Sequence, residues 1–274
     1  MCQWGFGISN RAIETMDIAA PPLPPVLDLR DRAFLLDIDG TILDIAPSPR
    51  QVWVPTGLRR TLTRLAELTA GAVALVSGRS LDEIDLIFSP LQLAAIGVHG
   101  AEMRVSGDAE VQSRTTPLSR ALKRRLATIA ELGPGILVEN KGYSLALHYR
   151  LAPDKGDEVL AAVRTICSDV GSEAVEILPG KLVVDVKPAA INKGNAVCDL
   201  MQLAPFAGRR PIFIGDDTTD LAVFGVIPQF DGQAYSVGGI GAKVAAKVDG
   251  HFDRPEAVRE WLARIAAEGL GQAQ

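Results

Sequence analysis

The hydrophobic pattern of the chain alternates between short apolar runs and longer segments with helical spacing. Apolar runs at 33–36 and 72–76 each stop at a polar turn. Helices are expected at about 56–68 and after the capping box Ser80-Leu81-Asp82-Glu83. Buried strands that alternate with helices predict a Rossmann-like, doubly wound α/β fold, in which a parallel sheet carries helices on both faces. Such sheets bind ligands at the carboxyl ends of their strands, so the polar turns mark the expected site.

A different pattern interrupts this rhythm between about residues 114 and 186. Two helical segments there are each followed by a pair of strands, expected at 136–139, 143–149, 174–178 and 182–186. The alternation of apolar strands and helices then resumes, with a helix over about 194–203 and a strand at 211–214. We therefore expect a discontinuous core domain, 31–113 and 187–274, that carries an inserted α+β cap domain, 114–186.

The N-terminal segment has neither of these patterns. Several prolines between positions 21 and 25 make a stiff, extended stretch, and we expect 1–30 to be a disordered lead-in with Met16 as an alternative start. Polar residues and prolines interrupt the segment throughout, which argues against a signal peptide or a membrane span.

The composition narrows the classes of partner and compartment. A net charge of −5 gives no reason to expect binding to nucleic acid or to an acidic membrane, which usually requires a clear basic excess. The three cysteines, Cys2, Cys167 and Cys198, lie far apart without metal-ligand spacing, so neither a disulfide framework nor a zinc site is indicated. A reducing compartment, the cytoplasm, is the expected location. An anionic substrate would need locally placed positive charges.

The segment Asp37-Ile38-Asp39-Gly40-Thr41 follows the first apolar run and is the first candidate for chemistry. A carboxylate at a strand end can attack phosphorus, and a second carboxylate two residues later can protonate the leaving oxygen and then activate water. Acidic residues and glycine also end strands for structural reasons alone. The five-residue pattern is more informative, since it should arise by chance in roughly one chain in a hundred of this length or fewer.

Asp216 and Asp217 follow a later apolar run and are candidates for a metal site beside Asp37. Carboxylates held close together repel each other unless a cation lies between them, and their oxygens suit Mg²⁺. The alternative is that Asp217 simply caps the helix that follows. A calcium-binding loop is not favoured, because its glycine belongs at the sixth position and Gly40 is the fourth residue from Asp37.

Ser77, Gly78, Arg79 and Lys193 are candidates for binding a phosphate. Ser77 and Gly78 offer a hydroxyl and backbone N–H groups at a strand end, and Lys193 immediately precedes an expected helix N-terminus. Taken singly, Lys193 and Arg79 are more often solvated surface charges. Together with a metal ion they would compensate the charge of a phosphate dianion.

The ordered set Asp37-x-Asp39-Gly40-Thr41, Ser77, Lys193 and Gly215-Asp216-Asp217-x-x-Asp220 resembles the four motifs of the haloacid dehalogenase superfamily. The resemblance implies that Asp37 is the nucleophile and a Mg²⁺ ligand, that Asp216 is another ligand, and that Asp39 is the acid/base and binds the metal through its backbone carbonyl. It also implies that Ser77 and Lys193 hold the phosphoryl group. An inserted cap between the second and third motifs is typical of members that act on sugar phosphates.

Segments 97–102, 138–142 and 148–150, together with Ser77-Gly78-Arg79, resemble the trehalose-6-phosphate phosphatase family. That resemblance covers nearly everything after residue 33 and implies that Glu139, Lys141 and Asp185 contact sugar hydroxyls. Without it, a solvated hairpin turn at 140–142 is at least as good an interpretation. Asp185 stands where a Glu is expected, and Asn140 where an Asp is common. We interpret His99 and His148 as structural or supporting residues, because the acid/base role is already filled.

The sequence therefore predicts a Mg²⁺-dependent phosphatase for trehalose 6-phosphate that works through an aspartyl-phosphate intermediate, with possible functional coupling to a trehalose-phosphate synthase. Alternatives are a phosphatase for sucrose 6-phosphate or a glucosylglycerol phosphate, and a phosphomutase. A non-enzymatic phospho-receiver is disfavoured, because receivers are shorter, lack a cap and carry the accepting Asp on a later strand.

Overall fold

The computed structural model describes residues 28–46, 51–171, 173–238 and 248–268. Most of the expected lead-in, 1–27, lies outside the described residues. The folded part begins before residue 31, because Asp28 caps a short 3₁₀ helix, Leu29–Asp31, and Leu29 packs in the hydrophobic core.

Within the described residues, eight strands form the main sheet in the order β12-β11-β10-β1-β2-β3-β4-β5. The strands from β12 to β3 are parallel, and β4 and β5 extend the sheet in antiparallel fashion. The sheet comprises β1 Arg32–Leu36, β2 Val73–Val76, β3 Ala94–Gly97, β4 Glu102–Arg104, β5 Gln112–Ser113, β10 Arg210–Gly215, β11 Gln233–Val237 and β12 Gly250–Phe252. β1 lies between β10 and β2, so the ends of these three strands meet at one edge.

Helices cover both faces of this sheet, which confirms the doubly wound prediction. Along β1 the side chains alternate, so Phe34 and Leu36 belong to one hydrophobic cluster and Ala33 and Leu35 to the other. The first cluster includes residues of α1 Leu58–Leu68, α2 Leu81–Phe88 and α8 Pro255–Glu268, and the second includes residues of α5 Lys193–Leu200 and α6 Leu221–Phe224.

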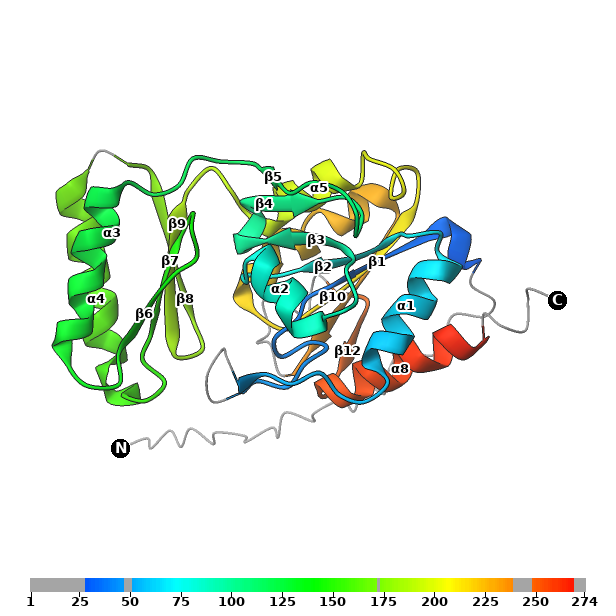
Figure 1. The fold of residues 1–274 in the computed structure, drawn as a ribbon, viewed down its shortest axis with the longest axis horizontal. Coiled ribbons are helices and arrows are strands. Elements are labelled where there is room, and N and C mark those ends of the chain that lie inside the picture. Colours follow the sequence, from blue (N-terminus) through cyan, green and yellow to red (C-terminus); the bar gives the residue numbers. More distant parts are fainter. Residues whose placement is uncertain (1–27, 47–50, 172, 239–247, 269–274) are drawn as a thin grey trace, which may run out of the picture.

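A separate antiparallel sheet forms in the predicted cap segment, with the order β6-β7-β9-β8. Its strands are β6 Leu137–Asn140, β7 Leu145–His148, β8 Val175–Gly180 and β9 Val183–Pro188, and its helices are α3 Arg120–Ala127 and α4 Gly156–Val170. The helices and one face of the sheet share a third hydrophobic cluster. Figure 1 shows this sheet between its own helices and the main sheet, so its other face is turned toward the core. We treat 114–186 as the cap and the flanking ranges as the core; these boundaries remain our proposal.

The expected elements are present, with shifted ends. The helix expected over 56–68 begins at Leu58, and the one expected over 194–203 runs from Lys193 to Leu200. Further short 3₁₀ helices are Val98–Gly100, Thr128–Leu132, Pro153–Lys155, Thr218–Asp220 and Ile227–Phe230. None of the helices in the described ranges combines the length and apolar character needed to cross a lipid bilayer.

An aromatic cluster on α8 anchors this helix to the sheet and provides a test of the fold. The ring of Trp261 is 1% exposed and packs against Phe34, Tyr235 and Phe252 at centroid distances of 6.4, 5.9 and 5.6 Å. We expect Trp261→Ala to lower the free energy of unfolding by about 3–5 kcal/mol, because it leaves a cavity. The measurement is urea unfolding followed by circular dichroism. Trp53→Ala is the matched control, since Trp53 is 64% exposed and its removal should change stability by less than about 0.5 kcal/mol.

Candidate active site

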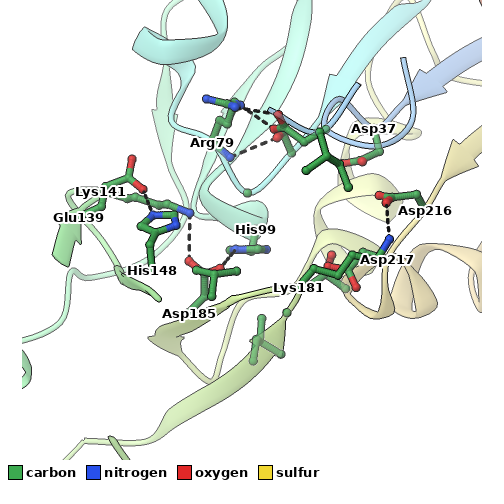
Figure 2. A pocket seen from close by; sticks show the side chains of 18 of the residues that line it. Asp37, Arg79, His99, Glu139, Lys141, His148, Lys181, Asp185, Asp216 and Asp217 are labelled. Atoms are coloured by element: carbon green, nitrogen blue, oxygen red, sulfur yellow. Dashed lines mark hydrogen bonds and ion pairs between the residues drawn. The ribbon is translucent and has the colours of Figure 1, made fainter. Parts of the chain in front are cut away.

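A cleft lies between the core and the cap, at the carboxyl ends of β1, β2 and β10. Every site residue predicted from the sequence lines it: Asp37, Asp39, Ser77, Gly78, Arg79, Glu139, Lys141, Asp185, Lys193 and Asp216. Figure 2 shows the core residues on one wall of the cleft and Glu139, Lys141 and Asp185 on the other. Core and cap therefore contribute to one site.

Asp37 lies directly after β1 and is 5% exposed. Its carboxylate accepts hydrogen bonds from Lys193 Nζ at 2.8 Å and from Thr41 Oγ1 at 3.1 Å. Burial raises the pKa of Asp37 well above its usual range; Lys193 opposes this shift, and the carboxylates of Asp220 and Asp216 add to it. The ammonium group of Lys193 therefore favours the ionised form of Asp37 against the effect of burial.

Lys193 opens α5 and is 3% exposed. Its Nζ lies 2.8 Å from Asp37 Oδ1 and 2.8 Å from Asp220 Oδ1, so one ammonium bridges two buried carboxylates. Burial alone would lower the pKa of Lys193, but Asp220 and Asp37 outweigh burial and raise it. The lysine stays charged, and its position is determined by both carboxylates.

Asp37, Asp216 and Asp220 form a cluster in which one oxygen of each lies within 4.8 Å of the others. Asp220 is already satisfied, because its Oδ2 accepts from the backbone N–H groups of Asp216 and Asp217 at 3.0 and 3.1 Å and its Oδ1 accepts from Lys193. Burial, followed by repulsion from Asp220, raises the pKa of Asp216 to about 7. These hard oxygen donors and their uncompensated negative charge fit a divalent cation between Asp37 and Asp216.

Gly40 makes this arrangement possible. Its φ of +86° is in the left-handed region, and a Cβ at this position would overlap the Asp216 carboxylate. Asp217 also caps the short helix Thr218–Asp220 by forming a capping box with Asp220. Helix capping was the alternative explanation for this acidic turn. Capping and the acidic cluster are thus properties of the same turn.

The carboxylate of Asp39 binds Arg79. Arg79 Nε and Nη2 donate to the two carboxylate oxygens at 2.6 and 2.7 Å, which is a bidentate pair. Burial opposes the charge of Arg79, but the hydrogen bond to Asp39 outweighs it and raises the pKa of the guanidinium. Both carboxylate oxygens of Asp39 are thus engaged by Arg79. Ser77 Oγ, 2% exposed, accepts from the Arg79 backbone N–H at 3.2 Å.

The cap wall consists of paired charges on the open face of its sheet. On β6, β7 and β9 the alternation that buries Val138, Leu147 and Val184 directs Glu139, His148 and Asp185 to the other face. Glu139 Oε2 lies 2.7 Å from His148 Nε2, and Asp185 Oδ1 lies 3.0 Å from Lys141 Nζ.

His99 brings the core into contact with this wall. Its Nε2 lies 3.6 Å from Asp185 Oδ2, and its backbone is left-handed with a φ of 55°. A Cβ on Gly78 would come within 2.6 Å of the His99 ring, so the ring depends on glycine at position 78. Burial would raise the pKa of Asp185, but Lys141 and then His99 outweigh it and lower the pKa. The two histidines that were assigned no direct role from the sequence therefore both line the cleft.

Comparison with known proteins identifies the family. The family model described as Trehalose-phosphatase matches residues 35–254. The chain belongs to the trehalose-phosphatase family. It is therefore a phosphatase, with a sheet and cap of the haloacid dehalogenase type.

Individual relatives agree with this assignment. A probable trehalose-phosphate phosphatase from Sinorhizobium fredii (strain NBRC 101917 / NGR234) is 40% identical over 240 residues, which is 87% of this chain and 89% of the relative. The trehalose-6-phosphate phosphatase of Escherichia coli (strain K12) is 36% identical over 234 residues, 85% of this chain and 86% of the relative. The C-terminal domain of trehalose-6-phosphate phosphatase from C. albicans has the same fold, with a TM-score of 0.77 at 22% identity over 87% of this chain and 92% of that one.

The sequence analysis did not identify several residues that line or support the cleft as site residues. They are Glu83, Arg150, Lys181 and Asp220. Asp220 was visible as the last residue of its motif, but its bond to Lys193 joins residues 27 positions apart and has no local signature. Arg150 and Lys181 lie in the cap and reach the core only through the packing of the two domains.

The bridge made by Lys193 predicts a pH-dependent loss of stability. Lys193→Met leaves two buried carboxylates without their cation, so we expect the free energy of unfolding to fall by about 3–5 kcal/mol at pH 8 without divalent ions. The loss should be smaller at pH 5.5, because the unpaired carboxylates then bind protons and become neutral. Urea titrations at both pH values measure the difference. Lys155→Met, at a partly exposed cap lysine, should leave the midpoint nearly unchanged; an equal loss at both pH values would contradict the charge argument.

Proposed function

We propose that this phosphatase hydrolyses trehalose 6-phosphate to trehalose and phosphate, with Asp37 as the nucleophile and Mg²⁺ as the cofactor. The observation that carries the proposal is the position of Asp37. Lys193 holds the Asp37 carboxylate beside Asp216 in the cleft. Charged side chains of the cap sheet line the opposite wall of this cleft. The names of the bacterial relatives support trehalose 6-phosphate as the substrate.

The first half of the reaction transfers the phosphoryl group to the enzyme. A carboxylate oxygen of Asp37 forms a bond to phosphorus while the bond between phosphorus and the sugar oxygen breaks, and Asp39 gives a proton to the departing sugar oxygen. Both Asp39 oxygens accept from Arg79 in the structure, so we propose that Asp39 leaves Arg79 and takes up this proton from solvent before the transfer. Ser77 and the backbone N–H of Gly78 bind the non-reacting phosphoryl oxygens.

The second half releases phosphate. Asp39, now ionised, takes a proton from water, whose oxygen attacks phosphorus and frees the Asp37 carboxylate. When bound, Mg²⁺ supplies a positive charge that offsets the dianion and polarises the phosphoryl oxygens. Asp37 and Asp216 would hold it through carboxylates and Asp39 through its backbone carbonyl. Lys193 keeps Asp37 oriented throughout.

The cap supplies the contacts to the sugar. Glu139 and Asp185 present carboxylate oxygens that accept from adjacent sugar hydroxyls, and Lys141 donates to a third. The pairs Glu139–His148 and Lys141–Asp185 hold these groups in place without the substrate.

Two wider proposals follow from the substrate. A phosphorylated disaccharide must be supplied by a glycosyl transfer reaction, so we propose functional coupling to a trehalose-phosphate synthase. We also propose a cytoplasmic location, since Cys167 and Cys198 are free thiols, as expected in a reducing compartment.

Removal of the nucleophile should abolish the reaction. We expect Asp37→Asn to lower phosphate release from trehalose 6-phosphate by at least about 10³-fold, because an amide cannot form the phosphoaspartate. The measurement is a phosphate assay, with circular dichroism to show an intact fold. Asp44→Asn, an exposed carboxylate on the same loop, is the control and should retain activity.

The same assay with sucrose 6-phosphate, a glucosylglycerol phosphate and glucose phosphates tests the substrate. If trehalose 6-phosphate is not among the best of these, the proposed substrate is wrong and the phosphatase assignment remains. Isomerised sugar phosphate without free phosphate would instead favour a phosphomutase. Steady turnover by Asp37→Asn would exclude Asp37 as the nucleophile.

Binding of Mg²⁺ should depend on pH through Asp216. Its pKa is raised to about 7 in the folded protein, so ionisation of this group destabilises the fold as pH rises toward 7, and a bound cation removes that cost. We expect the Mg²⁺-induced rise in Tm to be larger at pH 8 than at pH 5.5, with affinity falling up to about tenfold per pH unit below pH 7. Asp216→Asn should remove most of the response, and Asp217→Asn should keep it. A pH-independent response would contradict the assignment.

A further inference from the structure

The tip of the β8–β9 hairpin brings the cap onto the acidic turn of the core. Gly180 pairs with Val183, so only Lys181 and Leu182 form the loop. Leu182 has a left-handed φ of 61°, and its carbonyl accepts from the backbone N–H of Tyr149 at 3.0 Å. A Cβ on Gly180 would lie 3.7 Å from Asp217 Oδ2, which shows how closely the hairpin backbone approaches the core. The hairpin thus holds Lys181 beside the acidic turn of the core.

Lys181 points from this tip toward the acidic cluster. Its Nζ lies 3.7 Å from Asp216 Oδ2, beyond the range of a hydrogen bond, and its side chain is 68% exposed (Figure 2). Asp216 in turn belongs to the cluster whose oxygens lie within 4.8 Å of Asp37. A cap lysine is therefore within a short side-chain movement of the place where a phosphoryl group would meet Asp37.

The other cations of the cleft are already engaged. Among the described residues, Lys193 is bonded to Asp37 and Asp220, Arg79 to Asp39, and Lys141 to Asp185. Arg150 donates to the Ala46 carbonyl. Lys181 has one loose ion pair and can move at little cost.

A phosphate dianion requires additional positive charge at this place. The cleft is lined by Asp37, Asp39, Glu83, Glu139, Asp185, Asp216 and Asp217 against Arg79, Lys141, Arg150, Lys181 and Lys193. Acidic groups outnumber cationic ones, so a dianion would add to a charge that is already negative. A divalent cation between the carboxylates would also compensate Asp216 and repel the Lys181 ammonium.

We propose that Lys181 is a further catalytic residue, which leaves Asp216 and binds a phosphoryl oxygen of the substrate when the cap is closed. The inference rests on the proposed phosphatase reaction. It adds the ammonium group of Lys181, which moves from Asp216 only when the ligand carries a phosphoryl group. Because the ammonium comes from the cap and the nucleophile from the core, phosphoryl binding and cap closure stabilise each other. The unphosphorylated sugar lacks the anionic group that Lys181 would bind.

The test measures the binding of inorganic phosphate to the full-length protein in the presence of Mg²⁺, by product inhibition and by calorimetry. We expect Lys181→Met to weaken phosphate binding by at least about tenfold, as loss of a charge-assisted hydrogen bond should, and to lower kcat/KM for trehalose 6-phosphate by at least as much. Lys181→Arg, which keeps the charge, should recover most of the phosphate affinity. Lys155→Met, the same change at a partly exposed cap lysine that is not among the residues lining the cleft, should match the wild-type protein.

Two further measurements separate this role from others. Trehalose affinity should be the same in Lys181→Met and the wild-type protein, and Mg²⁺ affinity without phosphate, followed by Tm, should be unchanged or higher because a competing cation is gone. Unchanged phosphate affinity, weaker trehalose binding or weaker Mg²⁺ binding in Lys181→Met would each overturn the proposal. Failure of the wild-type protein to hydrolyse trehalose 6-phosphate would overturn the proposed substrate, while the phosphate comparison would still decide the role of Lys181.

Discussion

The bridge that Lys193 makes between Asp37 and Asp220 is the interaction on which the rest of the site depends. Two carboxylates and one ammonium are buried together, and none of them is stable there without the others. The bridge joins the end of β1, the start of α5 and the turn after β10, which are distant in sequence. Asp220 also binds the backbone N–H groups of Asp216 and Asp217, so the bridge places the remaining carboxylate of the cluster as well.

Packing of the two sheets converts this buried charge cluster into a cleft for a polar ligand. The core contributes strand ends and the cap contributes one face of a sheet whose other face is covered by helices. Strand alternation explains why charged side chains such as Asp185 reach the cleft while Val184 and Val186 pack against the cap helices. His99 and Lys181 each approach a carboxylate of the opposite domain, so the two walls of the cleft are joined by side-chain contacts.

The charges of the cleft are arranged as pairs, and this limits what each residue can do. Arg79 with Asp39 and Lys141 with Asp185 fix the directions of carboxylates, whereas Lys193 favours the ionised form of Asp37 against the effect of burial. Within the part of the chain that the structure describes, the side chains of Lys181 and Asp216 lack such close partners. Because the charges of these two side chains are not compensated, Asp216 is suited to bind a cation and Lys181 to bind an anion. The proposed reaction supplies both, a Mg²⁺ ion and a phosphoryl group.

Much of this protein is determined by the sequence itself, because strand and helix periodicity, the capping box at Ser80 and the Asp37 and Asp216 motifs depend on residues close together in the chain. They predicted the doubly wound sheet and an inserted cap, and together with the family resemblance they identified some of the residues that line the cleft. Only the tertiary structure decided the partners: that Arg79 holds Asp39, that Asp220 completes the acidic cluster, and that Lys181 reaches Asp216. Those contacts join segments far apart in sequence, and their geometry depends on how the two sheets pack, which no local pattern records.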